Sequence, residues 1–522
     1  MINIIGAGLA GLSAAITLAK NGRKCRLVSK QPSERAQSVL AEGGINAALD
    51  TMGENDTYRE HYEDTMNGGV YLADPNAVDE LTKNAPEIVR WLFELGVGFN
   101  MKDGKALLRN FGGQKKKRTA FAKSSTGKII MTALTDEARK YEANGFITRY
   151  PHHELKDISI DNGRCTGVVI CDSYSGEKIK FGGEVILACG GLNGFFEGRT
   201  TGTTQNDGSA AVIAFARGVE FANLEFIQYH PTTIGISGKR CLISEAARGE
   251  GGRLFAMING EKRYFMEEKY PQLGNLMPRD VVSRESYMIS RSDGCDGGVW
   301  LDMTGLAQEV WNNKLSDLRN ECIHYLGLDP IKEYIPVQPG IHYFMGGIYV
   351  NKEHMTNIEG LYAAGECASQ YHGANRLGGN SMLGAIYGGK TAAENTDESI
   401  EDTEHEEKYE NREYIDVTLS EKEEKELENI LYEGLGIVRC EETIKNALDK
   451  IENLEKGNMR VLFAKAMLIS ALERKESRGA HFRSDYPEKK EEFMKTTVIK
   501  IKEKDGKKEI EIRFCDIPKK SG

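Results

Sequence analysis

The sequence predicts an α/β protein with a parallel sheet at its centre, an inserted α+β domain and a helical C-terminal part. Three observations support this fold class. A short apolar strand runs into a glycine-rich turn at the N-terminus, further apolar strands end in glycines near residues 190 and 365, and apolar residues recur at helical spacing after residue 420. Because strands of one sheet flank the long segment between residues 191 and 360, that segment should contain a domain of its own.

The N-terminal unit has the order strand, turn, helix, strand. Residues 1–11 read MINIIGAGLAG, and an apolar helix pattern follows before the second strand, Cys25–Ser29. Gly6, Gly8 and Gly11 permit a tight turn, close approach to a pyrophosphate and close packing of helix on strand, while the helix N-terminus attracts phosphate charge. The pattern predicts a dinucleotide site, and a glycine-rich turn without a ligand is the alternative.

Features of the later strands refine this prediction. The second strand ends in Ser29-Lys30, where a plain NAD dehydrogenase carries an acid for the ribose hydroxyls, so the cation argues against that class. The strand at 184–191 ends in paired glycines, and the strand at 360–366 ends in Glu366. We expect this carboxylate to accept hydrogen bonds from a sugar-alcohol chain.

Composition excludes several classes of protein. The 522 residues carry a formal net charge of -10, which disfavours binding to nucleic acid or anionic lipid across the whole chain. Ten scattered cysteines without a CxxC pair predict neither a disulfide framework, nor an iron–sulfur cluster held by this chain, nor another metal site. No apolar run is long enough to span a membrane, and a strand that begins at the second residue leaves no room for a signal peptide. We therefore expect a cytoplasmic protein that reaches the inner membrane face only through a partner.

Several long strings carry a resemblance to a known family. They are LAEGG at 40–44, FGG at 111–113, HPTT at 230–233, SEAARGEGG at 244–252, PRD at 278–280, HYFMGG at 342–347, HGANRLGGNS at 372–381 and SRGAHFRSDYP at 477–487. In these strings the chain resembles the succinate dehydrogenase and fumarate reductase flavoprotein subunits and L-aspartate oxidase. The resemblance is strong over residues 1–395 and returns at the last string.

The resemblance implies a particular domain organisation. An FAD-binding domain of the glutathione-reductase type, with a Rossmann-like fold, should occupy residues 1–228 and 342–395. A capping domain that carries substrate residues should occupy 229–341, and a helical domain that ends in a β-hairpin should occupy 396–522. The alternating segments at 496–502 and 509–514, around Asp505-Gly506, predict that hairpin.

The resemblance, taken with the glycine turn and the ends of the predicted strands, implies the FAD-binding residues. These are Gly6, Gly8, Leu9, Ala10, Gly11, Ser29, Lys30, Ser38, Glu42, Gly43, Gly44, Ala188, Gly190, Asp207, Glu366, Asn380, Ser381 and Leu383. In the membrane complexes of the family, a histidine bonded covalently to FAD precedes the AEGG string. Here that position is Gln37. An amide cannot form this linkage, so we predict non-covalent FAD.

A dicarboxylate substrate needs two separate anion clamps. His230, Arg279, His342 and Arg376 are the candidates, because guanidinium pairs with a carboxylate bidentately and stays charged. Ser244 adds a hydroxyl that could bind a carboxylate.

The resemblance also assigns catalytic roles. It implies hydride transfer at flavin N5 and proton delivery by Arg279, with Glu245 and Arg248 as the proton relay. An arginine acid is awkward because guanidinium is a very weak acid, and it becomes tolerable only if the developing carbanion is a strong base. The alternative for Glu245 and Arg248 is an ordinary ion pair between domains.

Phe111 separates the two activities within the family. Aspartate oxidases carry an acid at this position, which would recognise the amino group of aspartate, whereas the reductases carry an aromatic residue that presses against the unsaturated substrate. Phe111 therefore favours fumarate and succinate, and L-aspartate oxidation is the alternative. A tRNA-modifying flavoprotein and a purely structural electron-transfer subunit fit less well, because the first needs a basic face and the second needs no substrate arginines. The resemblance makes an iron–sulfur or other electron-transfer protein the expected partner, and it leaves the oligomeric state open.

Overall fold

The computed structural model describes the whole chain apart from residues 124, 237, 398–403, 406–413, 455–456, 505–506 and 521–522. A five-stranded parallel sheet forms its centre, with strand order β21–β12–β1–β2–β8. The strands are β1 (Ile2–Ile5), β2 (Cys25–Ser29), β8 (Ile147–Pro151), β12 (Val185–Leu187) and β21 (Leu361–Ala363). The register pairs Ile5 with Leu187 and Leu187 with Ala363, so the carboxyl ends of β1, β12 and β21 lie together. The ligand site of such a sheet lies at this edge.

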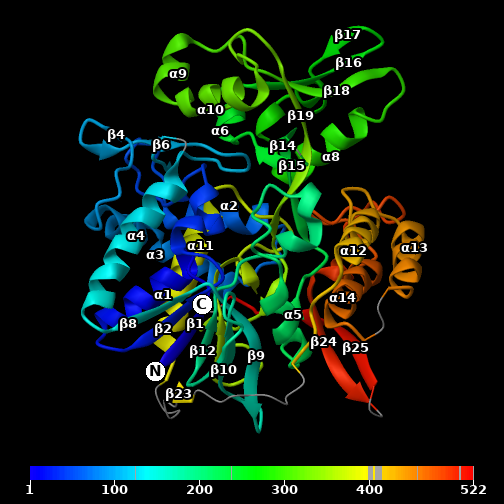
Figure 1. Ribbon diagram of the computed structural model, residues 1–522. Coiled ribbons are helices and arrows are strands. Elements are labelled where there is room, and N and C mark those ends of the chain that lie inside the picture. The colour runs from blue at the N-terminus through cyan, green and yellow to red at the C-terminus, as the bar shows by residue number, and fades with distance from the viewer. Residues whose placement is uncertain are drawn as a thin grey trace.

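Helices pack against this sheet on one side and an antiparallel sheet on the other (Figure 1). Helix α1 contacts both α11 and α4, and all but the last of its residues are buried. These elements are α1 (Leu9–Lys20), α2 (Tyr58–Gly68), α3 (Pro75–Glu94), α4 (Thr126–Ala143), α11 (Asn380–Asn395) and the antiparallel strands β9 (His153–Asp161), β10 (Arg164–Asp172), β11 (Lys178–Gly182) and β23 (Glu404–His405).

The inserted segment forms a separate body at the top of Figure 1. Its six-stranded antiparallel sheet has the order β15–β14–β19–β18–β16–β17 and an apolar core of its own. Its elements are β14 (Ile227–Ile236), β15 (Lys239–Leu242), α6 (Ala246–Gly249), β16 (Arg253–Ile258), β17 (Glu261–Arg263), α7 (Phe265–Lys269), α8 (Arg279–Ile289), β18 (Cys295–Asp302), α9 (Gln308–Asn313), α10 (Ser316–Glu321) and β19 (Ile335–Phe344). The paired strands β14 and β19 connect this body to the rest of the protein. The first residues of β14 and the last residues of β19 therefore lie at the junction.

The C-terminal part contains the expected helices, α12 (Glu421–Gly434), α13 (Glu441–Ile451) and α14 (Met459–Glu473). A capping box between Ser420 and Glu423 fixes the start of α12. The hairpin strands β24 (Lys495–Lys504) and β25 (Lys507–Asp516) pair antiparallel, as the alternating pattern predicts, whereas the predicted turn residues 505–506 lie outside the described residues.

The hairpin does not pack as an appendage of the helices. Strand β24 pairs with β13 (Phe221–Ala222), which continues through β20 (Gly347–Tyr349) to β22 (Ala368–Ser369). The end of the chain therefore completes a sheet that begins in the FAD-binding part. Among the helices of the described residues, none has the length and apolarity needed to cross a membrane.

Candidate active site

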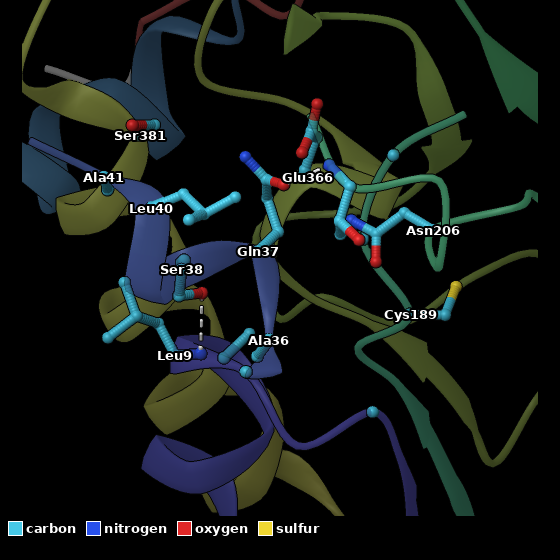
Figure 2. A pocket seen from close by; sticks show the side chains of 18 of the residues that line it. Leu9, Ala36, Gln37, Ser38, Leu40, Ala41, Cys189, Asn206, Glu366 and Ser381 are labelled. Carbon is cyan, nitrogen blue, oxygen red and sulfur yellow. Dashed lines mark hydrogen bonds between the residues drawn. The ribbon is translucent and has the colours of Figure 1, made fainter. Parts of the chain in front are cut away.

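One pocket collects most of the predicted site residues. Figure 2 shows part of its lining, including Leu9, Ser38, Glu366 and Ser381. The pocket begins at the carboxyl ends of β1 and β12 and reaches the junction with the inserted body. The predicted cofactor residues on its lining are Gly6, Gly8, Leu9, Ala10, Ser29, Lys30, Ser38, Glu42, Gly43, Gly44, Ala188, Gly190, Asp207, Glu366 and Ser381. The predicted substrate and catalytic residues on the same lining are Phe111, His230, Ser244, Glu245, Arg279, His342 and Arg376.

The turn before α1 has the shape that a diphosphate requires. Gly6 has a φ of +119°, and a Cβ there would lie 2.1 Å from the carbonyl oxygen of Ala188. Gly8 caps α1 without any side-chain hydrogen bond, so the first N–H groups of the helix face the pocket. Of these groups, the Leu9 N–H donates to Ser38 Oγ at 3.2 Å. The fit to a dinucleotide rests on this main-chain cradle.

Two carboxylates, those of Glu366 and Asp207, also line the cofactor end of the pocket. Burial raises the pKa of Glu366 to about 7, although the Phe344 N–H and Arg376 oppose the shift. Glu366 Oε1 accepts from Phe344 N at 3.1 Å. At the other carboxylate, Lys30 forms an ion pair with Asp207. The cation after β2 is thus neutralised by a residue from another part of the chain.

Gln37 is the residue that the resemblance places at the position of the covalent histidine. Its side chain lines the pocket, and its Oε1 accepts from the backbone N–H of Thr203 (Figure 2). The amide is therefore held in place by the chain itself and offers no nucleophile to a flavin.

Four predicted residues lie outside the lining. Gly11 packs α1 on β1, because a Cβ there would lie 1.8 Å from the Gly6 carbonyl oxygen. Leu383 is fully buried in the apolar core. The Asn380 side chain bonds to other buried polar groups, those of Asn46, His61 and Thr65. Arg248, the fourth, belongs to the charged chain described next.

Three charged residues form a continuous chain, of which Arg279 and Glu245 line the pocket and Arg248 lies behind them. Arg279, the first residue of α8, donates from Nε and Nη2 to Glu245 Oε2 at 2.9 and 2.5 Å. Arg248 Nη2 lies 3.4 Å from Glu245 Oε1, and Arg248 Nη1 donates to the Asn275 carbonyl. Burial alone would raise the pKa of Glu245, but Arg279 and Arg248 outweigh it and hold the pKa below its usual value.

Gln228 links the two arginines that the sequence singled out. Its Oε1 accepts from Arg279 Nη1 and from Arg376 Nη2, each at 3.1 Å, and its Nε2 donates to Asn375 Oδ1 and the Arg376 carbonyl, each at 2.8 Å. Arg279 comes from the inserted body and Arg376 from the FAD-binding part, so Gln228 sits between the two. Sequence reasoning missed this residue, although its position two before His230 on one strand places both side chains on the same face.

Arg376 is nearly buried and incompletely paired. Its guanidinium stacks on the Tyr343 ring at 4.3 Å, and its Nε has no hydrogen-bond partner among the described residues. Burial first, and Arg279 second, lower the pKa of Arg376 to about 9. Such a cation favours an anion beside it.

The loop that carries Arg376 is held by the C-terminal string. The Ala480 N–H donates to the Ala374 carbonyl at 2.9 Å, and a Cβ on Gly479 would lie 2.5 Å from that oxygen. On the other side, the Ala374 N–H donates to the Gly69 carbonyl at 2.9 Å. Arg376 is thus placed by main-chain contacts from both ends of the sequence.

The two histidine rings lie next to each other on the pocket lining. The ring centroids of His230 and His342 lie 5.1 Å apart. His342 Nδ1 bonds to Thr201 Oγ1 at 2.8 Å, while buried His230 Nε2 has no partner among the described residues. Burial, together with Arg279, holds the pKa of both well below the usual 6.5. Both rings are therefore neutral at pH 7 and can each donate one N–H.

Phe111 and Ser244 complete this end of the pocket. Phe111 is buried, and its ring comes within 3.1 Å of the position that a Cβ on Gly43 would take. The neighbouring Gly112 N–H donates to Glu245 Oε1 at 3.2 Å. No charge therefore stands at residue 111, and its loop helps to orient the relay carboxylate.

Fold and site define an FAD-dependent oxidoreductase, and comparisons with known proteins agree. An "FAD binding domain" family model matches residues 2–382, and a "Fumarate reductase flavoprotein C-term" model matches residues 454–520. The chain is 36% identical to the succinate dehydrogenase flavoprotein subunit of Bacillus subtilis, covering 96% of this chain and 93% of that protein. It is 35% identical to the L-aspartate oxidase of Pyrococcus furiosus, covering 96% and 98%. Among solved structures, quinol fumarate reductase FrdA from E. coli has a TM-score of 0.86 at 29% identity, covering 99% and 96%.

The chain belongs to the family of succinate dehydrogenase and fumarate reductase flavoprotein subunits, which includes L-aspartate oxidase. The fold class predicted from the sequence is confirmed: an FAD-binding domain, a capping domain and a helical C-terminal domain. The cofactor FAD is confirmed at the level of the family and its domain.

Proposed function

We propose that the protein interconverts fumarate and succinate with non-covalently bound FAD, acting mainly as a fumarate reductase. One observation carries the proposal: Arg279 and Arg376, distant in sequence and from different domains, converge on one Gln228 oxygen beside two neutral histidines. A four-carbon diacid has a charge at each end, and this cluster offers cationic and N–H donors on both sides of one cavity.

The unpartnered groups suggest how the substrate is held. Arg376 Nε and His230 Nε2 have no partner among the described residues. Arg376 Nε and the His342 ring would bind one carboxylate, while His230 Nε2 and the Ser244 hydroxyl, which both line the same pocket, would bind the other. Binding would supply buried donors with acceptors that the free protein lacks. Because a buried unpaired donor is costly, the gain favours dianions over neutral analogues.

FAD bound in this pocket would supply the hydride once an electron donor had reduced it. Phe111 would press on the flat alkene and exclude water from it. Arg279 would give its proton to the adjacent carbon, and Glu245 would return a proton from Arg248 to Arg279. Hydrogen bonds already join Arg279 to Glu245, and Glu245 Oε1 lies 3.4 Å from Arg248 Nη2, so the proton moves through groups that are in or near contact.

Gln37 bears on the direction of the reaction. Without a covalent bond, the flavin would have a lower potential, which favours fumarate reduction over succinate oxidation. An iron–sulfur or other electron-transfer protein would then supply the electrons. A redox titration tests this part: a flavin potential well above the fumarate/succinate couple would contradict it.

L-Aspartate oxidation is the second candidate, favoured by 35% identity to L-aspartate oxidase over nearly the full length of both chains. Phe111 opposes it, because a phenyl ring cannot pair with the ammonium group of aspartate. The purified protein should oxidise a reduced viologen dye when fumarate is added. No turnover with fumarate, together with hydrogen peroxide made from aspartate, would reverse the choice.

A further inference from the structure

The two pocket histidines have different partners at their Nδ1 atoms. His342 Nδ1 lies 2.8 Å from Thr201 Oγ1, a side-chain hydroxyl. His230 Nδ1 accepts a hydrogen bond of 3.3 Å from the main-chain N–H of Thr232. A neutral imidazole carries a hydrogen on one nitrogen and a lone pair on the other, so the partner of Nδ1 decides whether Nε2 can donate.

Main-chain contacts fix the position of Thr201 independently of its hydroxyl. Thr201 follows the short helical segment Asn193–Arg199, and its N–H donates to the Ile341 carbonyl at 2.8 Å. The preceding residue, Thr200, forms a parallel β-bridge with Ile341. Because Ile341 directly precedes His342 on β19, the backbone itself brings the hydroxyl and the imidazole together.

The hydroxyl hydrogen of Thr201 is directed to His342. The other acceptor near it among the described residues is the Ile341 carbonyl oxygen, which lies 3.4 Å from Oγ1 and already accepts the Thr201 N–H. Hydroxyl hydrogen bonds are usually about 2.7–2.8 Å long, so the contact of 2.8 Å to Nδ1 is the stronger of the two. Nδ1 therefore accepts, and the hydrogen of the neutral ring lies on Nε2.

The main chain gives His230 the same tautomer. Nδ1 lies 3.3 Å from both the N and the O of Thr232, and an N–H on Nδ1 would place its hydrogen against that of the main-chain N–H. The Thr232 hydroxyl donates to the Ile243 carbonyl at 2.9 Å. His230 therefore also carries its hydrogen on Nε2, which is buried and has no partner among the described residues.

The Nε2 atoms are the ring nitrogens left for the pocket. His230 and His342 line the pocket, whereas Thr201 and Thr232, the partners of Nδ1, do not. With ring centroids 5.1 Å apart, the two histidines offer two N–H donors to one cavity.

We infer that Thr201 is a positioning residue that holds His342 in the tautomer with hydrogen on Nε2 and so makes this ring a donor to a substrate carboxylate. The tautomer follows from contacts within the protein, whereas its effect on a substrate rests on the proposed function. Without the hydroxyl, both tautomers of His342 become accessible, and the one with a lone pair on Nε2 repels a carboxylate oxygen. Thr201→Val removes the hydroxyl and keeps the branched shape, whereas Thr201→Ser keeps the hydroxyl.

The first experiment measures the tautomer in FAD-loaded protein without substrate. Nitrogen NMR spectra of histidine-labelled protein distinguish protonated from unprotonated ring nitrogens, and His342→Gln identifies the signals of His342. We expect hydrogen on Nε2 of His342 in the wild type and in Thr201→Ser, and a mixture of tautomers in Thr201→Val. His230 should keep its hydrogen on Nε2 throughout. Hydrogen on Nδ1 of His342 in the wild type, or an unchanged spectrum in Thr201→Val, would overturn the inference.

The second experiment measures binding of malonate, a dianion that FAD cannot convert to an alkene, by the change in flavin absorbance. Thr201→Val should raise the dissociation constant at least about tenfold, because a charge-assisted hydrogen bond is lost, and Thr201→Ser should restore it. KM for fumarate should rise in parallel, with a smaller change in kcat. Thr233→Val is the matched control, since it removes a hydroxyl that donates to the Gln338 carbonyl outside the pocket, and malonate affinity should be unchanged.

The outcomes separate this inference from the proposed function. Equal loss of malonate affinity in Thr201→Ser and Thr201→Val, or no loss in either, would refute the effect of the tautomer on the substrate. Failure of the wild-type protein to bind malonate would contradict that effect together with the dicarboxylate site. Absence of fumarate turnover, with tautomers and malonate affinities as expected, would refute the proposed reaction and support the role of Thr201.

Discussion

The two ends of the pocket are built in opposite ways. The cofactor end is mainly main chain: glycines, a bare helix N-terminus and the edge of a parallel sheet. The substrate end is made of side chains from six segments that lie far apart in the sequence, with Gln228 bonded to both Arg279 and Arg376. Main-chain sites tolerate substitutions that keep the backbone path, whereas a side-chain cluster depends on each functional group.

Arg279→Lys should show the largest effect, at the substrate end. Lysine lacks the fork that contacts Glu245 and Gln228 together, so turnover should fall about 10³-fold. The measurement is fumarate-dependent oxidation of a reduced viologen, with FAD content checked by absorbance. Arg284→Lys, on the same helix and against Phe482, is the matched control and should retain activity. Equal loss in both variants would show that α8 is merely destabilised.

Gln228→Glu tests whether the two arginines act as a clamp for dianions. A carboxylate at this position would neutralise the guanidinium groups internally and compete with the substrate. KM for fumarate should rise about 10²-fold, with a smaller change in kcat. Gln205→Glu, an exposed glutamine at the cofactor end of the pocket, should have little effect on KM. An unchanged KM in Gln228→Glu would mean that the substrate does not approach these arginines.

Gly8→Ala probes the main-chain end. The added Cβ would lie 3.2 Å from Ser38 Oγ and project toward the site of the diphosphate. FAD affinity should fall about tenfold, equivalent to about 1.4 kcal/mol. Gly98→Ala is the control, since a Cβ there meets nothing within 4 Å. Loss of fumarate affinity without loss of FAD affinity would contradict the division of the pocket into two ends.

The smallest expected effect is a pH dependence at Glu366. Because burial raises its pKa to about 7, the group is protonated in the free protein below that pH and ionised above it. The ionised form accepts hydroxyl hydrogen bonds better, so FAD affinity should increase a few-fold as pH rises through 7. Titration of flavin fluorescence measures this, and Glu366→Gln should give a flat profile. A wild-type profile without slope would remove Glu366 from the cofactor site.

The same contrast explains what the sequence could and could not predict. Gly6, Gly8 and Gly11 are close together in the chain, and local geometry gives each a definite role, so strand, turn and helix followed from spacing alone. Gln228 carried only a weak signal: its spacing to His230 puts both side chains on one face of a strand, but an amide has no evident chemistry until two arginines from elsewhere surround it. Leu383 was predicted as a cofactor residue, and the structure places its side chain, on α11, in the apolar core, because closeness to a matched string does not distinguish pocket from core.

The C-terminal hairpin illustrates the same limit. Alternation and an Asp-Gly pair predict two strands, and the strands are present. Their partner, β13, has only two residues and lies far away in the sequence. Nothing in so short a segment marks it as a pairing partner.

The contact between Gly479–Ala480 and Ala374 has a consequence for synthesis of the protein. The glycine cradle and the central sheet are complete once residues up to about 395 have left the ribosome, whereas the support for the arginine loop is translated almost last. A nascent chain would therefore be able to bind a flavin before it can bind a diacid, and a chain clipped at its C-terminus would bind only the flavin. In that interval the cell would contain an exposed flavin without its proper electron acceptor.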